Sequence, residues 1–539
     1  MKNKMCWILP LMLICCGGFW LCGAQAINSG DIRGTVTDAT SAVIPGASVT
    51  VLNVNTGVSK TYTTDASGVY DTSSIVNGTY QVTFSHSGFQ QLVRGPITVE
   101  VGFTTVNAEL KVGSISQKVI VTTNVPLLQT ESGTQQQTLS AKDMAKLPQT
   151  GGADWENFMI LLPGATGCTS TANSNCNQGQ NNPGQGVSVN GNLPYSNVLA
   201  DGASTTLSHS QNANPAIFET VAELQVSTSS FSAQYGTGGI IFNQISKGGT
   251  NHFHGSAYDY FQNDALNSSG YQFGGTSAVP FLRYNDFGAS IGGPILKDKM
   301  FFYFDYDQIV DHGSASNSFN TIPTAAVMSG DFSSSTYQIY DPTTQTIAYD
   351  SKGNPYPVRK SFQQEYGCNC IPASMIDSVA SKFQQWYPTP SNHIAGGNFV
   401  TGSTNSEGEP QNNFYSSLPQ STPYRKYFGR FDYQITTNNR LSMSDTQSDT
   451  PVIYPNSVTA CPIGCQAGDV DNNNAQITDV WNISPRTINE ARMGYTWQGN
   501  FFEDLALGQG YASQLGWQFA KADDFPAIQF TRNYPLRMD

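Results

Sequence analysis

Charge, histidine and long apolar runs are scarce in this chain. Charged residues make up 12% of its 539 positions, histidine occurs six times, and the formal net charge is −13. Nucleic-acid binding needs a basic surface, so this acidic balance argues against a nucleic-acid partner. Beyond the first 26 residues no apolar run is long enough for a transmembrane helix. A phosphate-binding Gly-Lys-Ser/Thr loop is also missing.

The first 26 residues have the layout of a cleaved signal peptide. Lys2 and Lys4 supply a positive start, residues 7–21 an apolar stretch, and Ala24-Gln25-Ala26 a small-residue cleavage site. Pro10 interrupts the apolar stretch, which is too short to favour a membrane anchor. The sequence therefore predicts export.

The cysteines fit an exported protein. Ten occur, and four of them fall in the signal peptide. The other six form close pairs: Cys168 with Cys176, Cys368 with Cys370, and Cys461 with Cys465. In an oxidising compartment such pairs predict small disulfide loops, with the Cys368–Cys370 ring the tightest. No histidine pair stands nearby, which disfavours the alternative of a metal site.

Three composition patterns follow the signal peptide, and together they predict a mainly β fold. Residues 27–113 hold short strands between Gly-rich turns, as in a small β-sandwich. Residues 114–252 read as mixed α/β, with a helix capped by Ser140 and a second helix over 154–162. Strand-like pieces follow at 186–190, 197–200, 222–228 and 240–246.

From residue 253 to 539, amphipathic strand pairs with tight turns alternate with long polar loops. The turns are expected at 292–299, 436–439 and 484–487, and the longest loop covers about 311–422. Apolar residues alternate with polar ones over 426–435 and again over 488–497. This layout predicts the first strands of a transmembrane antiparallel β-barrel. A soluble sheet with one buried face would give the same alternation.

The segment 30–113 resembles the carboxypeptidase regulatory-like domain. The resemblance rests on Gly34, the Ile44-Pro45-Gly46-Ala47 turn, residues 64–70 and Gly78-Thr79-Tyr80. It implies a transthyretin-like sandwich without catalytic groups, so no peptidase chemistry is expected.

Later motifs resemble TonB-dependent outer-membrane receptors of the Oar-like kind. The plug motifs are Leu162-Pro163-Gly164, Val198-Leu199-Ala200-Asp201-Gly202, Glu223-Leu224-Gln225-Val226 and Ser246-Lys247-Gly248-Gly249-Thr250-Asn251. The barrel motifs are Phe253-His254-Gly255, Asn285-Asp286-Phe287-Gly288 and Ser329-Gly330-Asp331-Phe332. The resemblance implies a plug over 114–252. It also implies contact with outer-membrane lipid and coupling to the periplasmic TonB protein.

Such receptors close a barrel of about 22 strands, whereas alternation predicts only about seven here. We therefore expect the barrel, and with it the transporter, to be incomplete in these 539 residues.

The resemblance also points to a TonB-contact segment just before the plug. The candidate residues are Ser116, Gln117, Lys118, Val119, Ile120 and Val121. TonB would bind there by strand addition, which requires an extended, unpaired segment. The same residues could instead form the last strand of the sandwich or the first strand of the plug.

Enzyme-like motifs in the chain have stronger structural explanations. Gly288-Ala289-Ser290-Ile291-Gly292 matches a nucleophile elbow, but a strand follows it where a hydrolase needs a helix. His252 and His254 lack a nearby third ligand, and the loop starting at Asp469 lacks the Gly and Glu of a calcium site. We therefore expect neither an enzyme nor a cofactor.

The sequence thus predicts a receptor in the outer membrane of a Gram-negative-type bacterium. It would take up an extracellular nutrient, either an oligosaccharide or a siderophore-like molecule. The competing hypothesis is a surface adhesin or carbohydrate-binding outer-membrane protein that transports nothing.

Overall fold

The computed structural model describes most of the chain outside the signal peptide. The described residues are 28–113, 118–121, 135–144, 146, 165–166, 188–189, 197–205, 217–229, 241–268, 271–272, 275–276, 279, 281–394, 396–405, 408, 410–421, 423–484, 487–518, 525, 528–529 and 537–538. They fall into two compact units. The first holds residues 1–133, 433–441 and 478–492, and the second holds the rest. No helix among the described residues is long and apolar enough to span a membrane.

The N-terminal domain consists of two sheets that share one core. One sheet contains β1 (Gly30–Asp38), β4 (Val69–Asp71), β7 (Gly102–Thr105) and β8 (Ala108–Leu110). The other runs in the order β3 (Ser59–Thr63), β2 (Ser48–Asn53), β5 (Gly78–Ser85), β6 (Gln91–Val99) and β9 (Lys118–Val121). Alternate residues of each strand point inward. Ile32 of β1 and Val49 and Phe84 of the second sheet therefore pack together without exposure to solvent.

Strand β9 shows that part of the candidate TonB-contact segment is paired, which is the alternative that the sequence left open. Lys118–Val121 pairs in parallel with β6, so these four residues form the last strand of the N-terminal domain. Ser116 and Gln117 lie outside the described residues. Because β9 ends the order of its sheet, its outer edge has no partner strand among the described residues.

A five-stranded sheet follows, here called the inner sheet. Its order is β10 (Gln135–Ser140), β15 (Val221–Ser229), β16 (Ile241–Ser246), β13 (Asn197–Ala200) and β14 (Ala203–Ser204). The described part of this region also holds α1 (Ala141–Met144), η2 (Phe218–Thr220) and the pair β11 (Ala165–Thr166) and β12 (Ser188–Val189). As predicted, Ser140 caps α1, and its hydroxyl accepts from the Asp143 amide at 3.3 Å. The helix expected over 154–162 lies outside the described residues.

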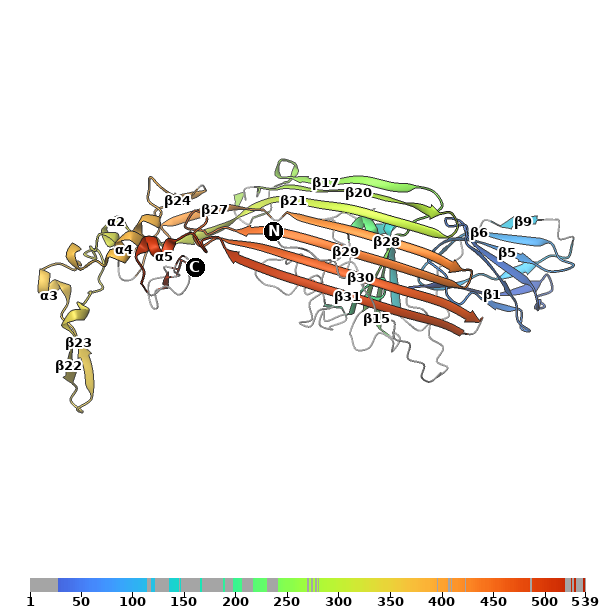
Figure 1. Ribbon diagram of the computed structural model, residues 1–539, viewed down its shortest axis with the longest axis horizontal. Helices are drawn as coiled ribbons and strands as arrows, with labels where there is room; N and C mark the ends of the chain where they lie inside the picture. The colour runs from blue at the N-terminus through green and yellow to red at the C-terminus, as the bar shows by residue number, and fades with distance from the viewer. Residues whose placement is uncertain are drawn as a thin grey trace. The chain divides into compact units, whose positions relative to one another are not determined.

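The largest sheet, here called the wall, is antiparallel and long-stranded (Figure 1). Its main order is β17 (His254–Asn263), β20 (Arg283–Leu296), β21 (Met300–Asn320), β28 (Tyr424–Thr436), β29 (Asn439–Tyr454), β30 (Gln466–Ser484) and β31 (Thr487–Asp504). Strands β27 (Phe414–Ser421) and β24 (Gly397–Phe399) extend it beside β21. The main order contains the seven strands that alternation predicts. A membrane strand needs only about 9–11 residues. At 21 residues, β21 is longer than that minimum.

The turns of the wall are shorter than the sequence suggested. The predicted 292–299 turn shrinks to residues 297–299, because β20 continues through Leu296 and β21 begins at Met300. Likewise β28 ends at Thr436 and β29 begins at Asn439. The pattern missed the end of β20 because Gly292, Gly293 and Pro294 are of residue types usual in turns.

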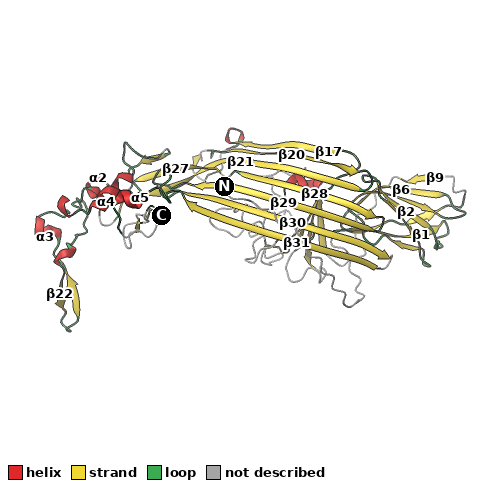
Figure 2. Cartoon of the chain, in the orientation of Figure 1, coloured by secondary structure: helices red, strands yellow, loops and turns green. Residues whose placement is uncertain are grey.

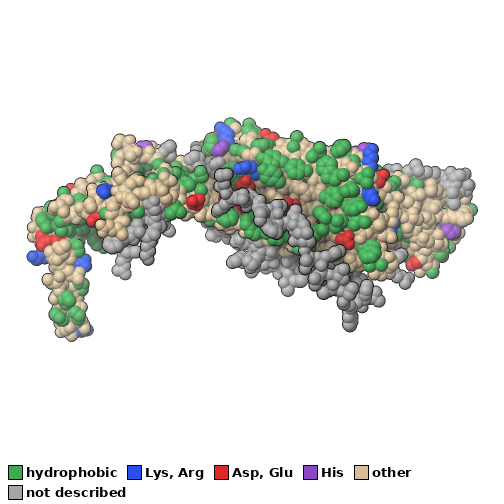
Figure 3. Space-filling view, viewed as in Figure 1, with side chains coloured by type: hydrophobic (Ala, Val, Ile, Leu, Met, Phe, Trp, Pro, Cys, Tyr) green, Lys and Arg blue, Asp and Glu red, His purple; other side chains and the backbone are tan. Residues whose placement is uncertain are grey.

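The two faces of the wall differ in chemistry. Large apolar side chains on one face are exposed, among them Phe304, Trp481 and Met493. The space-filling view shows hydrophobic side chains gathered over the wall strands (Figure 3). The opposite face carries polar residues and contacts the inner sheet, so we call it the inward face. Apolar side chains on the outer face and polar side chains on the inward face are typical of a β-sheet exposed to lipid.

The expected long loop near 311–422 is instead a folded module. Its helical turns are α2 (Ala325–Met328), η5 (Pro342–Thr344), α3 (Phe362–Tyr366), η6 (Ala373–Met375), α4 (Ser378–Phe383) and η7 (Gln384–Trp386), and its short strands are β22 (Thr346–Tyr349), β23 (Pro355–Val358), β25 (Ser403–Thr404) and β26 (Pro410–Gln411). Figure 2 shows most helices of the molecule gathered here. The other short elements are η4 (Asp264–Leu266), β18 (Tyr271–Gln272), β19 (Gly275–Thr276), α5 (Tyr511–Leu515), β32 (Ile528–Gln529) and β33 (Arg537–Met538).

One apolar cluster joins this module to two other connecting segments. Phe383 and Phe414 pack with Val458, which lies between β29 and β30, and with Leu515 of α5. No local pattern predicts this cluster, because its members lie far apart along the chain. The three segments, centred on 321–413, 455–465 and 505–518, therefore share a single core.

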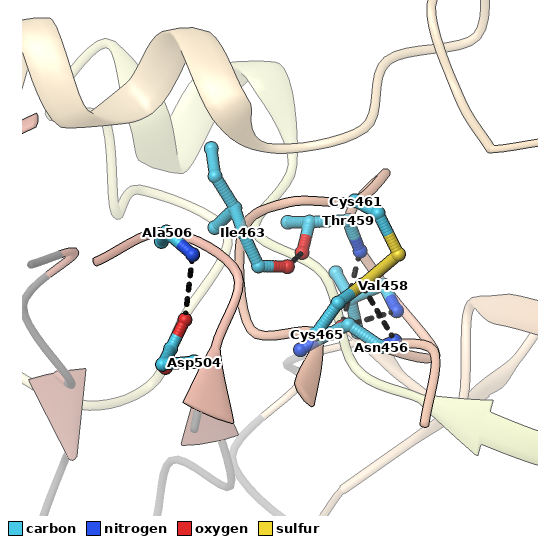
Figure 4. Close-up of a disulfide and its surroundings, with 8 residues drawn as sticks. All are labelled: Asn456, Val458, Thr459, Cys461, Ile463, Cys465, Asp504 and Ala506. Atoms are coloured by element: carbon cyan, nitrogen blue, oxygen red, sulfur yellow. Dashed lines mark hydrogen bonds between the residues drawn. A yellow bond between two sulfur atoms is a disulfide. The ribbon is translucent and has the colours of Figure 1, made fainter. Parts of the chain in front are cut away.

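Two of the three predicted cysteine pairs lie within the described residues. The structure joins Cys461 to Cys465 and Cys368 to Cys370. Cys168 and Cys176 lie outside the described residues. In the Cys461–Cys465 loop, the Asn456 amide donates to the Cys465 sulfur at 3.3 Å, and the Thr459 hydroxyl donates to the Ile463 carbonyl at 2.8 Å (Figure 4).

Candidate functional site where the inner sheet meets the wall

A tight turn in the inner sheet presents one carboxylate to the wall. Asp201 and Gly202 join β13 to β14, with φ angles of 44° and 78°. Two-residue hairpin turns of this kind need positive φ at both central positions, which favours Asp-Gly. The Asn243 side chain accepts from the Gly202 amide at 3.0 Å and fixes the turn. Both Asp201 oxygens then accept from Ser246, from its amide at 2.9 Å and its hydroxyl at 2.6 Å.

Arg430 of β28 connects this turn to the wall. Its Nη1 donates to the carbonyl and hydroxyl oxygens of Ser246, both at 2.8 Å, and lies 3.5 Å from Asp201. Its Nε and Nη2 donate to the two oxygens of Asp432 at 2.8 and 3.0 Å. One guanidinium can contact the inner sheet and Asp432 at the same time, because its N–H donors form a planar fork, which a lysine lacks.

Two serines of β29 complete the cluster. The Ser444 hydroxyl donates to Asp201 at 2.9 Å, and the Ser442 hydroxyl donates to Asp432 at 2.7 Å. We call Asp201, Ser246, Arg430, Asp432, Ser442 and Ser444 the latch. The side chains of Arg430, Asp201 and Asp432 are 12%, 15% and 16% exposed. Removing one partner of such a buried pair typically costs about 3–5 kcal/mol, because an uncompensated charge stays behind.

After the inner sheet, the backbone at Gly248 and Gly249 lies very close to the wall, which leaves little room for a side chain. A Cβ on Gly249 would lie 2.3 Å from the Phe302 carbonyl oxygen and 2.7 Å from that of Gly293. At Gly248 it would lie 3.0 Å from Asp432. The paired glycines after Ser246 therefore let the backbone pass against the wall before β17 begins.

A second polar contact lies beside the latch. The Tyr260 hydroxyl on β17 hydrogen-bonds Glu219 of η2, and Lys247 lies 3.6 Å from the same carboxylate. Tyr258, two residues earlier, donates to Asp305 at 3.3 Å and to Asp307 at 3.1 Å. These wall carboxylates are almost fully buried, with Asp305 0% and Asp307 5% exposed.

Two of the motifs quoted from the sequence meet at this site. The Val198–Gly202 motif supplies Asp201, and the Ser246–Asn251 motif supplies Ser246 and both glycines. In the sequence, Arg430 and Asp432 are only two of the polar residues in the alternating segment 426–435. No local signal could reveal their role, because Arg430 and Ser246 are 184 residues apart.

The enzyme-like motifs occupy ordinary structural positions. Ser290 sits within β20, and its hydroxyl lies 2.9 Å from that of Ser256 on the neighbouring strand. Asp469 and Asp471 of β30 come close to Asp449, with ligand oxygens within 4.8 Å of one another. Sequence reasoning missed this grouping because it considered only the loop that begins at Asp469. Arg425, 3.9 Å from Asp449, supplies a nearby positive charge.

Comparison with known proteins identifies the class. Residues 245–537 match the family model of the outer membrane beta barrel domain, and residues 31–113 match that of the carboxypeptidase regulatory-like domain. The chain belongs to the outer membrane beta barrel family. A particular relative is the TonB-dependent transporter Oar of Myxococcus xanthus, which is 30% identical over 299 residues. That alignment covers 52% of this chain but only 27% of the relative's length.

Solved structures of outer-membrane receptors are also similar to parts of the chain. The siderophore receptor PirA of Pseudomonas aeruginosa shares 13% identity at a TM-score of 0.36, covering 68% of this chain and 41% of that one. The alcaligin outer-membrane receptor FauA of Bordetella pertussis shares 12% identity at a TM-score of 0.31, covering 70% and 48%.

Proposed function

We propose that this protein is a TonB-dependent transporter of the outer membrane, with the inner sheet as its plug. The latch carries the proposal. It fastens the inner sheet to the wall through one arginine and a few hydrogen bonds. Among the described residues, a small apolar cluster of Ile217 with Tyr303 and Phe428 accompanies it. A mainly polar contact of this kind is stable at rest and can be broken and re-formed while exposing little apolar surface to water. That is what a plug needs if it must move when a nutrient passes.

TonB would engage the chain at β9. This strand ends its sheet, and an exposed strand edge is a template for strand addition. Two routes are open to TonB. It could pair with the outer edge of β9 in place, or it could take β9 away from β6.

A crosslinking experiment tests the TonB contact. We expect a Val119→Cys variant to crosslink to a cysteine in the TonB strand in outer-membrane preparations. Thr83→Cys, placed in β5 between two partner strands, is the control and should not crosslink. Leu92→Cys combined with Val119→Cys distinguishes the routes when Val121→Cys is the reporter, because Leu92 and Val119 are register partners and a disulfide between them would hold β9 on β6. Crosslinking at position 121 that persists means that TonB pairs with the outer edge of β9 in place. Failure of every position from 116 to 121 to crosslink would refute the TonB assignment.

A further inference from the structure

The inward face of β29 and β30 carries a run of polar side chains without charge. Ser444 contacts the inner sheet and so marks the inward face of β29, and alternate residues share that face. The run, here called the neutral track, consists of Thr446, Ser448, Thr450, Asn472, Asn474 and Gln476. Each is at most 8% exposed.

The neutral track contains buried polar atoms that no protein group satisfies. Its amides bond along and across the strands, with Asn472 donating to Ser448 at 3.1 Å and Gln476 donating to Asn474 at 3.2 Å. Among the described residues, the Thr450 hydroxyl, Asn472 Oδ1 and Gln476 Oε1 have no hydrogen-bond partner. Leaving such an atom buried and unpaired costs about 1–3 kcal/mol, so three on adjacent strands suggest a place for a ligand.

The charge distribution limits what that ligand can be. On the β20 and β21 side, the inward face carries Asp286, Asp305 and Asp307, all at most 5% exposed. The neutral track has no ionised group. A charged ligand would lose its hydration there without gaining an ionic partner, which is strongly unfavourable. A neutral ligand rich in hydroxyl groups instead brings O–H donors to the two amide oxygens and a partner to the Thr450 hydroxyl.

We propose that the neutral track binds an uncharged, hydroxyl-rich ligand, and that this ligand is a neutral oligosaccharide. The inference rests on the proposed function, because it names the substrate class of the same transporter. Asn472 and Gln476 are four residues apart on one strand, a separation of about 13 Å. Acceptors this far apart suit a chain of sugar rings better than a single ring.

Two shape-conserving variants test the proposal. Thr450→Val and Gln476→Met each remove an unpaired polar atom and keep the side-chain size. Gln447→Met, on the opposite face of β29, is the matched control. The full chain in detergent is exposed to an array of neutral and acidic oligosaccharides and, separately, to a set of ferric siderophores. Its thermal midpoint is recorded without ligand.

The expected result couples two opposite changes. The wild type retains neutral oligosaccharides, and the Thr450→Val, Gln476→Met double variant binds them about tenfold more weakly. The Thr450→Val single variant melts at a higher temperature when empty, because it removes a buried unpaired hydroxyl. The Gln447→Met control changes neither property.

Three outcomes would overturn the inference. The wild type could bind no neutral oligosaccharide, or it could bind acidic glycans or ferric siderophores selectively. The double variant could also bind neutral oligosaccharides as tightly as the wild type does. A lower thermal midpoint with unchanged binding would assign the three atoms to buried water. If a charged ligand binds and its uptake requires TonB, the inference fails while the proposed function stands. If neutral glycans bind but their uptake persists without TonB, the proposed function fails instead.

Discussion

Two clusters in this protein have the same composition, an arginine between two aspartates, yet they join different things. In the latch, Arg430 bridges Asp201 of the inner sheet and Asp432 of the wall. In the N-terminal domain, Arg33 lies 2.9 Å from both Asp31 and Asp71, which belong to neighbouring strands of one sheet.

Their surroundings differ as well. Arg33 is 36% exposed and stacks on Phe103 at 4.1 Å, whereas Arg430 is 12% exposed and uses its donors on both sheets. The comparison teaches that the residues of an ion-pair cluster do not define its role. What matters is whether its partners sit on one folded unit or on two elements that must be held together.

Arg430→Met should give the largest effect. It leaves the Asp201 and Asp432 carboxylates buried without a cation, a loss of about 3–5 kcal/mol at the contact. We expect faster hydrogen exchange across β16 and new protease cleavage in the inner sheet, with the N-terminal domain unchanged. Arg430→Lys is the matched control. It keeps the charge but loses the fork, so its effect should be intermediate. Unchanged β16 exchange in Arg430→Met would mean that the latch does not hold the inner sheet.

Arg33→Met should have a smaller and purely local effect. Arg33 is 36% and Asp71 39% exposed, and water screens their charges, so we expect a loss of about 1 kcal/mol in the N-terminal domain. Thermal unfolding of residues 27–121 expressed alone, which include β9, would measure it. Hydrogen exchange of β16 in the full chain should not change. A change at β16 would contradict the distinction between the two clusters.

The pH dependence of the N-terminal domain sharpens the comparison further. Burial, and next the negative charge of Asp71, raise the pKa of Asp31 to about 7 despite the nearby Arg33. A carboxyl with a raised pKa in the folded state stabilises the fold while it is protonated. This contribution is complete below about pH 4 and is lost as the pH rises through about 7.

The test compares wild type with Asp31→Asn, which cannot ionise. Both versions of the isolated domain are melted between pH 4 and 8. We expect the variant to gain stability relative to wild type as the pH rises, with most of the change complete by about pH 7.5. A difference that is constant with pH would show that Asp31 does not titrate in this range.

Local patterns predicted the strands of this protein well. Alternation at 426–435 located β28, and the Ser140 cap located α1, because both depend on residues close in sequence. Strand ends were less accurate, as at Gly292 and Pro294, where turn-forming residues sit inside β20.

The contacts that make the site could not be predicted in this way. Arg430 looked like any polar residue on a wet face, and its partners come from a different sheet. The segment 118–121 was extended, as expected, but pairing with β6 depends on register across the domain rather than on its own residues. Local sequence patterns could not predict the neutral track either, because it depends on which side chains of two strands face inward.

The shared core of the three connecting segments has a consequence for how such a protein can evolve. Loops that stand apart can change one at a time, and each change is tested alone by selection. Here Val458 packs against residues of two other segments, so a new side chain there must be matched by Phe383, Phe414 or Leu515. We expect these segments to diverge together. A chimera that exchanges only the 455–465 segment, with Val458, for that of a relative should fold worse than one that exchanges all three segments.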